Sequence, residues 1–194
     1  MSQNQRILVV EPDPDKVQSI IDALTEGGWL NVRALAQVSS LQRIIKEFAP
    51  DIVLIDMANP DRDTLEHVIM VTDTQSRAVA LFVDQTDEEL TQAALGAGVS
   101  AYVVDGLQMH RIKPVLDTAI ARFQMMRKMR SELDAAKQAL EDRKTIDRAK
   151  GILMRQRGMS EDEAYTLLRQ TAMGQGRKII DVAQALVTAA DLLG

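Results

Sequence analysis

The first half of the chain alternates short apolar runs with amphipathic stretches, and this alternation limits the fold more than any other feature. The runs "ILVV", "IVLI" and "VALFV", which begin at Ile7, Ile52 and Val79, are apolar at successive positions. Strands that are buried on both faces of a sheet show this pattern. Five such strands separated by helices predict a parallel sheet with helices on both faces, followed by a helix from about His110.

Acidic residues cluster where these strands are expected to end. Glu11 and Asp13 follow the first strand, and Asp56, Asp84 and Asp105 follow the third, fourth and fifth strands. Because ligands of open α/β sheets bind at the carboxyl ends of the strands, these carboxylates are candidates for a site. The alternative is that they are ordinary polar residues at the ends of strands.

Residues 114–142 keep a helical periodicity without interruption and predict a coiled-coil linker helix. Charged Arg130 and Lys137 interrupt the apolar seam, which is typical of a marginal, reversible homodimer. A single long helix that packs on its own domain is the alternative. The apolar members of the seam are Leu116, Ala119, Phe123, Met126, Leu133 and Leu140.

A different helical pattern occupies the remainder of the chain. A new apolar stripe begins with Ile146, and Gly158 is expected to end its helix. The sequence "SEDE" at 160–163 predicts a capping box that begins a second helix. A third helix follows a loop flanked by Gly174 and Gly176. The tail is therefore expected to be a small unit of three helices.

Gly151 lies inside the first of these helices, although an interior glycine costs about 1 kcal/mol relative to alanine. At about 100° per residue, it falls on the side opposite the apolar stripe, within about 60° of Lys144, Arg148 and Arg155. A glycine required for core packing would lie on the apolar side. We therefore interpret Gly151 as a point where a phosphate backbone or a base approaches the helix closely.

Charge is distributed unevenly along the chain. The formal net charge is −5, but residues 1–110 hold 7 basic and 17 acidic side chains, whereas residues 143–178 hold 9 and 4. A compact basic segment on an acidic protein indicates a polyanion binder. The sequence has no cysteine, no apolar run of membrane-spanning length and no secretory signal, so we expect a cytoplasmic protein without disulfides.

The sequence "DRKTIDRAKGILMRQRGMSEDEAYTLLRQTAM" at 142–173 closely resembles the ANTAR domain of bacterial transcription antiterminators of the AmiR and NasT type. The resemblance covers about residues 130–193. It implies a three-helix domain that binds a pair of RNA hairpins in a nascent leader transcript and so prevents a terminator from forming.

The same resemblance implies that Lys150 and Gly151 of the motif contact RNA. Tyr165 offers a base-stacking face, although a place at the edge of the core is the alternative. Other cations are added from charge and helix geometry. The complete predicted set is Arg143, Lys144, Arg148, Lys150, Gly151, Arg155, Arg157 and Arg169.

Residues 1–122 resemble the receiver domain of response regulators, with Asp56 of "PDIVLIDM" at the phosphoacceptor position. Three positions depart from that family: Pro12 replaces an acid, Asp84 a hydroxyl residue and Asp105 a lysine. An acid in place of the lysine reverses the charge that would stabilise a phosphorylated aspartate. We therefore predict a pseudo-receiver without phosphorylation. Its degenerate pocket comprises Glu11, Asp84 and Asp105.

The phrase "SAYVVDGL" and these substitutions are similar to the NasT branch of the family. This similarity implies control of nitrate or nitrite assimilation genes by a NasS-like sensor protein that releases the antiterminator when the anion binds. A phosphorylation-dependent DNA-binding response regulator is the alternative. A metal-dependent enzyme is disfavoured, because His67 and His110 lie outside the acidic cluster. No cofactor or metal is expected.

Overall fold

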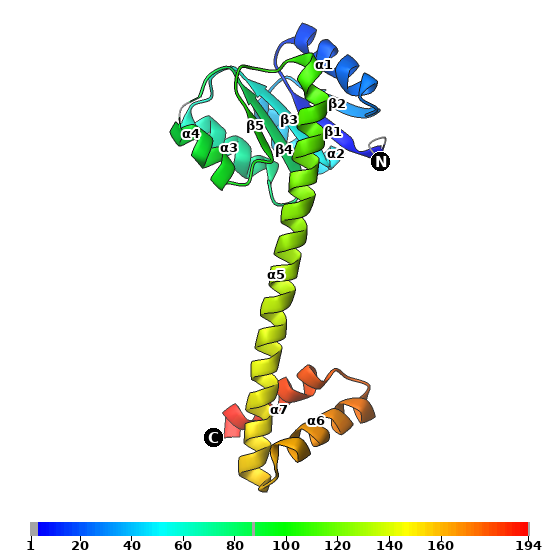
Figure 1. The fold of residues 1–194 in the computed structure, drawn as a ribbon, viewed down its shortest axis with the longest axis vertical. Helices are drawn as coiled ribbons and strands as arrows, with labels where there is room; N and C mark the ends of the chain where they lie inside the picture. The colour runs from blue at the N-terminus through cyan, green and yellow to red at the C-terminus, as the bar shows by residue number, and fades with distance from the viewer. Residues whose placement is uncertain (1–3, 87, 194) are drawn as a thin grey trace. The chain divides into compact units, whose positions relative to one another are not determined.

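The computed structural model describes residues 4–86 and 88–193, which form two compact units divided after Lys128 (Figure 1). Helix α5 (Met109–Arg157) contributes to both units. The first unit also contains β1 (Arg6–Val10), α1 (Pro14–Glu26), β2 (Asn31–Leu35), η2 (Val38–Ser40), α2 (Leu41–Phe48), β3 (Ile52–Met57), α3 (Arg62–Thr72), β4 (Ala78–Val83), α4 (Glu88–Gly96) and β5 (Ala101–Val103). The second unit also contains α6 (Glu161–Gln175) and α7 (Ile179–Leu193).

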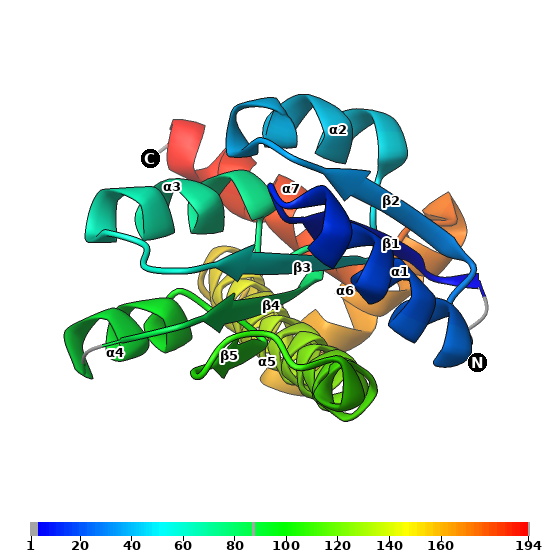
Figure 2. The same ribbon diagram turned by 90° about the horizontal axis from the view of Figure 1, so that it is seen from above.

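The five strands form one parallel sheet in the order β2-β1-β3-β4-β5, which confirms the predicted architecture (Figure 2). Alternate residues of β1 pack into two different hydrophobic cores, one on each face of the sheet. Leu8 and Val10 pack with α2 and α3, whereas Ile7 and Val9 pack with α1 and the beginning of α5. Every residue of β4 is buried, as its continuous apolar run predicted. The sheet therefore carries helices on both faces, and its loops gather at the carboxyl ends of the strands.

The beginning of α5 corrects the predicted coiled-coil seam. Leu116 and Ala119 are fully buried in the core that covers one face of the sheet, and Phe123 is partly buried against it. These side chains pack within their own unit, so they are not available to a second helix. The heptad pattern cannot distinguish the two partners, because a helix that covers a sheet needs the same apolar stripe.

The middle of α5 presents apolar side chains to solvent. Met126 is 42% exposed, and Leu133 and Leu140 are each 54% exposed. Met129, which the predicted seam omitted, is 56% exposed and follows Met126 by three residues on the same side of the helix. We call Met126, Met129, Leu133 and Leu140 the α5 stripe. Among the helices of the described ranges, none is both long and apolar enough to span a membrane.

The second unit is a three-helix unit, as predicted. Its core joins Ala149 and Leu153 of α5 to Leu168 of α6 and Val187 of α7. Helix α5 ends before Gly158, which has a φ of +66°, and the capping box at 160–163 is present. The loop before α7 is shorter than predicted, because Gly174 lies inside α6 and Gly176 provides the left-handed cap.

Candidate functional site

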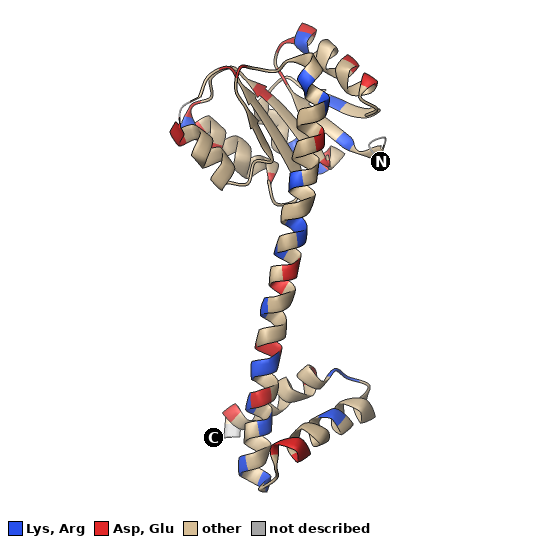
Figure 3. Ribbon diagram, in the orientation of Figure 1, with Lys and Arg blue, Asp and Glu red and all other residues tan. Residues whose placement is uncertain are grey.

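The basic side of the second unit is built on the last turns of α5. We call Lys144, Arg148, Gly151 and Arg155 the basic face; these positions recur at helical spacing opposite the side that is buried by Ala149 and Leu153. Figure 3 shows both blue and red residues along the lower part of α5, with blue residues at its end. Carboxylates therefore lie beside the cations of this part of α5.

Gly151 is not required by packing within the described residues. A Cβ atom built at Gly151 would come within 4 Å of one atom beyond the neighbouring helix backbone, Nη1 of Arg155 at 3.6 Å. This separation is an ordinary van der Waals contact, and the atom is the end of a flexible side chain. The geometry agrees with the interpretation that an external group explains this glycine.

Arg148 connects the basic face to the last helix. Its Nη2 atom donates to Oδ1 of Asp191 on α7 over 2.6 Å, and both side chains are more than half exposed. A cavity of about 220 Å³ adjoins this pair. Its lining residues are Arg148, Ile152, Arg155, Gln156, Ala190 and Asp191. The tertiary fold thus brings a carboxylate to a face that local sequence predicted to be basic.

The resemblance implied that Lys150 contacts RNA, but in the structure its side chain is mostly buried. Its side chain is only 14% exposed, and its Nζ atom lies 2.6 Å from both Oδ1 of Asp147 and Oε1 of Glu161. Hydrogen bonds with these carboxylates raise the pKa of Lys150, and the bond from Lys150 lowers the pKa of Asp147. Lys150 therefore ties α5 to the beginning of α6, and it is not an outward-facing cation.

The other predicted cations are exposed. Lys144 pairs with Glu141 over 2.7 Å. Arg143 lies 4.0 Å from Asp147, with 83% of its side chain exposed. Within the part of the chain that the structure describes, Arg155, Arg157 and Arg169 make no ion pair. Tyr165 on α6 is 44% exposed, so it lies outside the core and is accessible for stacking.

The acidic cluster of the first unit is centred on Asp56 at the end of β3. Asp56 is buried and shares a side-chain hydrogen bond with buried Glu11. Burial, followed by the bond with Glu11, raises the pKa of Asp56 to about 6, although nearby Lys16 opposes this shift. Asp56 lies inside β3, one residue before its end, whereas the sequence analysis placed it after the strand. Glu11 follows β1, which pairs directly with β3. Asp84 and Asp105 are exposed after β4 and β5.

Lys16 is a member of this cluster that the sequence analysis missed. Its Nζ atom reaches from the first turn of α1 to within 3.7 Å of Oδ2 of Asp56. The sequence could have revealed Lys16, because it lies three residues after Asp13, the residue that caps α1, and therefore in the first turn of that helix. A cavity of about 400 Å³ lies beside the pair and extends to Thr64 on α3. Within the described ranges 4–86 and 88–193, no group of three or more His, Asp or Glu side chains is arranged so that it could hold a metal ion.

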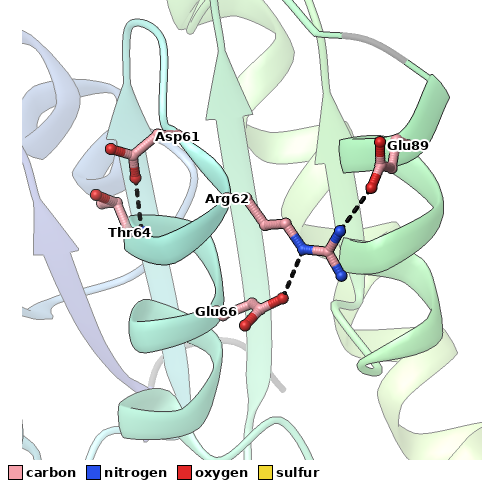
Figure 4. Close-up of polar contacts among 5 residues, drawn as sticks. All are labelled: Asp61, Arg62, Thr64, Glu66 and Glu89. Carbon is pink, nitrogen blue, oxygen red and sulfur yellow. Dashed lines mark hydrogen bonds and ion pairs between the residues drawn. The ribbon is translucent and has the colours of Figure 1, made fainter.

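A network beside this cavity joins α3 to α4 (Figure 4). Asp61 caps α3 by accepting a hydrogen bond from the backbone N–H of Thr64 over 2.7 Å. Arg62 donates to Glu66 over 2.9 Å and to Glu89 of α4 over 2.5 Å. The side chains of Arg62, Glu66 and Glu89 are all more than half exposed, so their ion pairs add little stability.

Comparison with known proteins finds similarities for both units. Residues 134–187 match the family described as the ANTAR domain. A receiver domain from Clostridium thermocellum has a TM-score of 0.52 and 22% identity over 63% of this chain and 98% of its own. The chain thus combines a unit with the receiver fold and a segment that matches the ANTAR domain, which confirms the fold that the two resemblances implied.

The relatives of this chain are regulators. It is 24% identical to the transcriptional regulatory protein PdtaR of Mycobacterium tuberculosis over 183 residues, 94% of this chain and 89% of that protein. It is 32% identical to the nitrate regulatory protein of Klebsiella oxytoca over 84 residues, which are 43% of this chain and 21% of that protein. The similarity to the second relative is therefore confined to part of each chain.

Proposed function

We propose that this protein is an RNA-binding transcription antiterminator that holds paired hairpins in a nascent leader mRNA and so prevents a terminator from forming. The observation that carries the proposal is Gly151, whose missing side chain is not required by packing against any residue that the structure describes. Its position between Arg148 and Arg155 gives a phosphate backbone or a base direct access to the helix.

The exposed cations supply the electrostatic part of binding. Arg155 and Arg157 are exposed near Gly151, and the pair between Arg148 and Asp191 lies at the surface. Exposed ion pairs contribute only about 0–1 kcal/mol, so RNA phosphates can displace such a carboxylate. Tyr165 adds an accessible ring on which an unpaired base can stack.

The α5 stripe provides the dimer part of the proposal. Four exposed apolar side chains at helical spacing form a surface suited to a second copy of the helix. A homodimer would carry two ANTAR domains, one for each hairpin of the pair. RNA then favours the dimer, because it binds both domains together.

Control by a partner protein completes the proposal. The similarity to a nitrate regulatory protein supports a role in nitrate or nitrite assimilation under a NasS-like sensor in the cytoplasm. Such a sensor can act only by binding the RNA-incompetent arrangement more tightly than the competent one. Asp56 is buried beside Glu11 and already pairs with Lys16, which supports a first unit that acts without phosphorylation.

The deciding experiment titrates the full-length protein with the leader RNA of its operon at several salt concentrations. Duplex DNA of unrelated sequence serves as the control. We expect tighter binding to the RNA and a strong decrease in affinity with salt, because several phosphates are neutralised. Equal affinity for the DNA would refute the proposal and favour the DNA-binding response regulator.

A further inference from the structure

Carboxylates of the second unit accompany most cations on and around the basic face. Two kinds of pair can be distinguished. Lys150 has only 14% of its side chain exposed; its pair with Asp147 lies within α5, and its pair with Glu161 joins α5 to α6. The other pairs are exposed and leave each cation within reach of an incoming ligand. These exposed pairs are Lys144 with Glu141 at 2.7 Å, Arg148 with Asp191 at 2.6 Å and Arg143 with Asp147 at 4.0 Å.

Asp191 shows that this arrangement is a product of the fold. It comes from the last helix, 43 residues after Arg148 in the sequence, and its carboxylate lines the same cavity as Arg155. The Arg148 and Asp191 side chains are 59% and 52% exposed, so the pair contributes little stability. Its carboxylate nevertheless puts a negative charge where a phosphate must sit to reach Arg148, and like charges at such distances repel.

We propose that Asp191 and Glu141 are specificity-determining residues that screen the basic face against polyanions without the correct shape. This inference rests on the proposed RNA-binding function. Non-specific binding depends almost wholly on contacts between cations and phosphates, so the two carboxylates weaken it directly. A hairpin also gains contacts at Gly151 and with exposed bases, so it can displace the carboxylates and still bind.

The test uses the full-length protein with Asp191→Asn, Glu141→Gln and both changes together. Asp162→Asn on α6 is the matched control, because Asp162 is exposed and makes no ion pair among the described residues. The probes are stem-loops that the unmodified protein selects from a library with randomised loops, and a random-sequence DNA duplex of equal length. Thermal unfolding of each variant establishes that it is folded.

We expect each of the two substitutions to raise affinity for duplex DNA by about threefold to tenfold, and affinity for the selected stem-loops by less than about twofold. The slope of log affinity against log salt for the duplex should steepen by about one per substitution. Asp162→Asn should change neither ligand's affinity by more than about twofold. The ratio of hairpin to duplex affinity therefore falls only when a screening carboxylate is removed.

Three results would overturn this inference. The first is an unchanged ratio of hairpin to duplex affinity, whether neither affinity changes or both rise equally. The others are the same gain with Asp162→Asn and a loss of hairpin affinity in a folded Asp191→Asn variant. These differ from failure of the proposed function, in which the unmodified protein selects no stem-loop at all.

Discussion

Gly151 and Arg155 lie one helical turn apart, and Nη1 of Arg155 stands 3.6 Å from the place that a Cβ atom on Gly151 would occupy. The guanidinium group therefore lies beside bare helix backbone. A ligand that contacts this backbone also meets the cation, so one helical turn offers both close approach and charge.

Replacing Gly151 with alanine should separate folding from binding. We expect Gly151→Ala to stabilise the second unit by about 0.5–1 kcal/mol, because alanine is the better helix former and the space is open. Hairpin affinity should fall by about tenfold or more, since the methyl group blocks close approach. Gly174→Ala in α6, where nothing lies within 4 Å, is the control and should leave RNA binding unchanged. Unimpaired RNA binding by Gly151→Ala would exclude close approach as the explanation.

Lys150 and Arg155 should differ in the salt dependence of RNA binding. Lys150→Met removes the contact between α5 and α6, so we expect a lower melting temperature and an unchanged salt slope. Arg155→Met should reduce the slope by about one, because an exposed phosphate contact is lost. Titrations over a range of salt concentrations measure both. A reduced slope for Lys150→Met, with the unit still folded, would restore Lys150 as a direct phosphate contact.

The stability of the first unit should decrease as the pH rises through about 6. The pKa of Asp56 is raised from 3.8 to about 6, so the folded state retains a proton that the unfolded chain has lost. This contribution is complete below the unfolded pKa and disappears above the folded one. The unmodified protein should lose about 1–3 kcal/mol of unfolding free energy between about pH 4 and about pH 7.5, and Asp56→Asn, which cannot ionise, should abolish this loss. Chemical unfolding at several pH values measures the free energy of unfolding, and Asp22→Asn, at an exposed position, is the control. Parallel plots of this free energy against pH for the unmodified protein and Asp56→Asn would contradict the prediction.

Phosphodonors should leave Asp56 unmodified. Pro12 and Asp105 stand where the receiver family has an acid and a lysine, and Lys16 lies 3.7 Å from the carboxylate on the α1 side. We expect no acyl phosphate after treatment with acetyl phosphate and Mg²⁺, as judged by mass spectrometry. Asp56→Asn treated in parallel identifies modification elsewhere. A stable acyl phosphate on Asp56 would revive the response-regulator alternative.

The α5 stripe should control self-association. Leu133→Lys introduces a charge into an exposed apolar surface, so we expect it to weaken a homodimer and to lower affinity for paired hairpins. Ala135→Lys, at an exposed position on nearly the opposite side of α5, is the matched control. Light scattering with and without RNA, and with the sensor protein, measures the assembly. A monomer that binds paired hairpins at full affinity throughout would refute the dimer.

The sequence alone predicted the features that depend on local pattern. Continuous apolar runs predicted the buried strands, and Ser160 with Glu163 predicted the beginning of α6. The side of α5 on which Gly151 lies also followed from helical spacing. These features depend on residues a few positions apart, and secondary structure fixes the relation between such residues.

Only the tertiary structure decided which side chains from distant segments meet. It placed Lys16 beside Asp56, Asp191 beside Arg148, and Leu116 inside a core where the heptads had suggested a dimer seam. An apolar stripe specifies that a helix face is buried but not what covers it, and a charge specifies no partner. Those choices depend on how the elements pack, because contacts between residues far apart in sequence form only when their helices and strands come together.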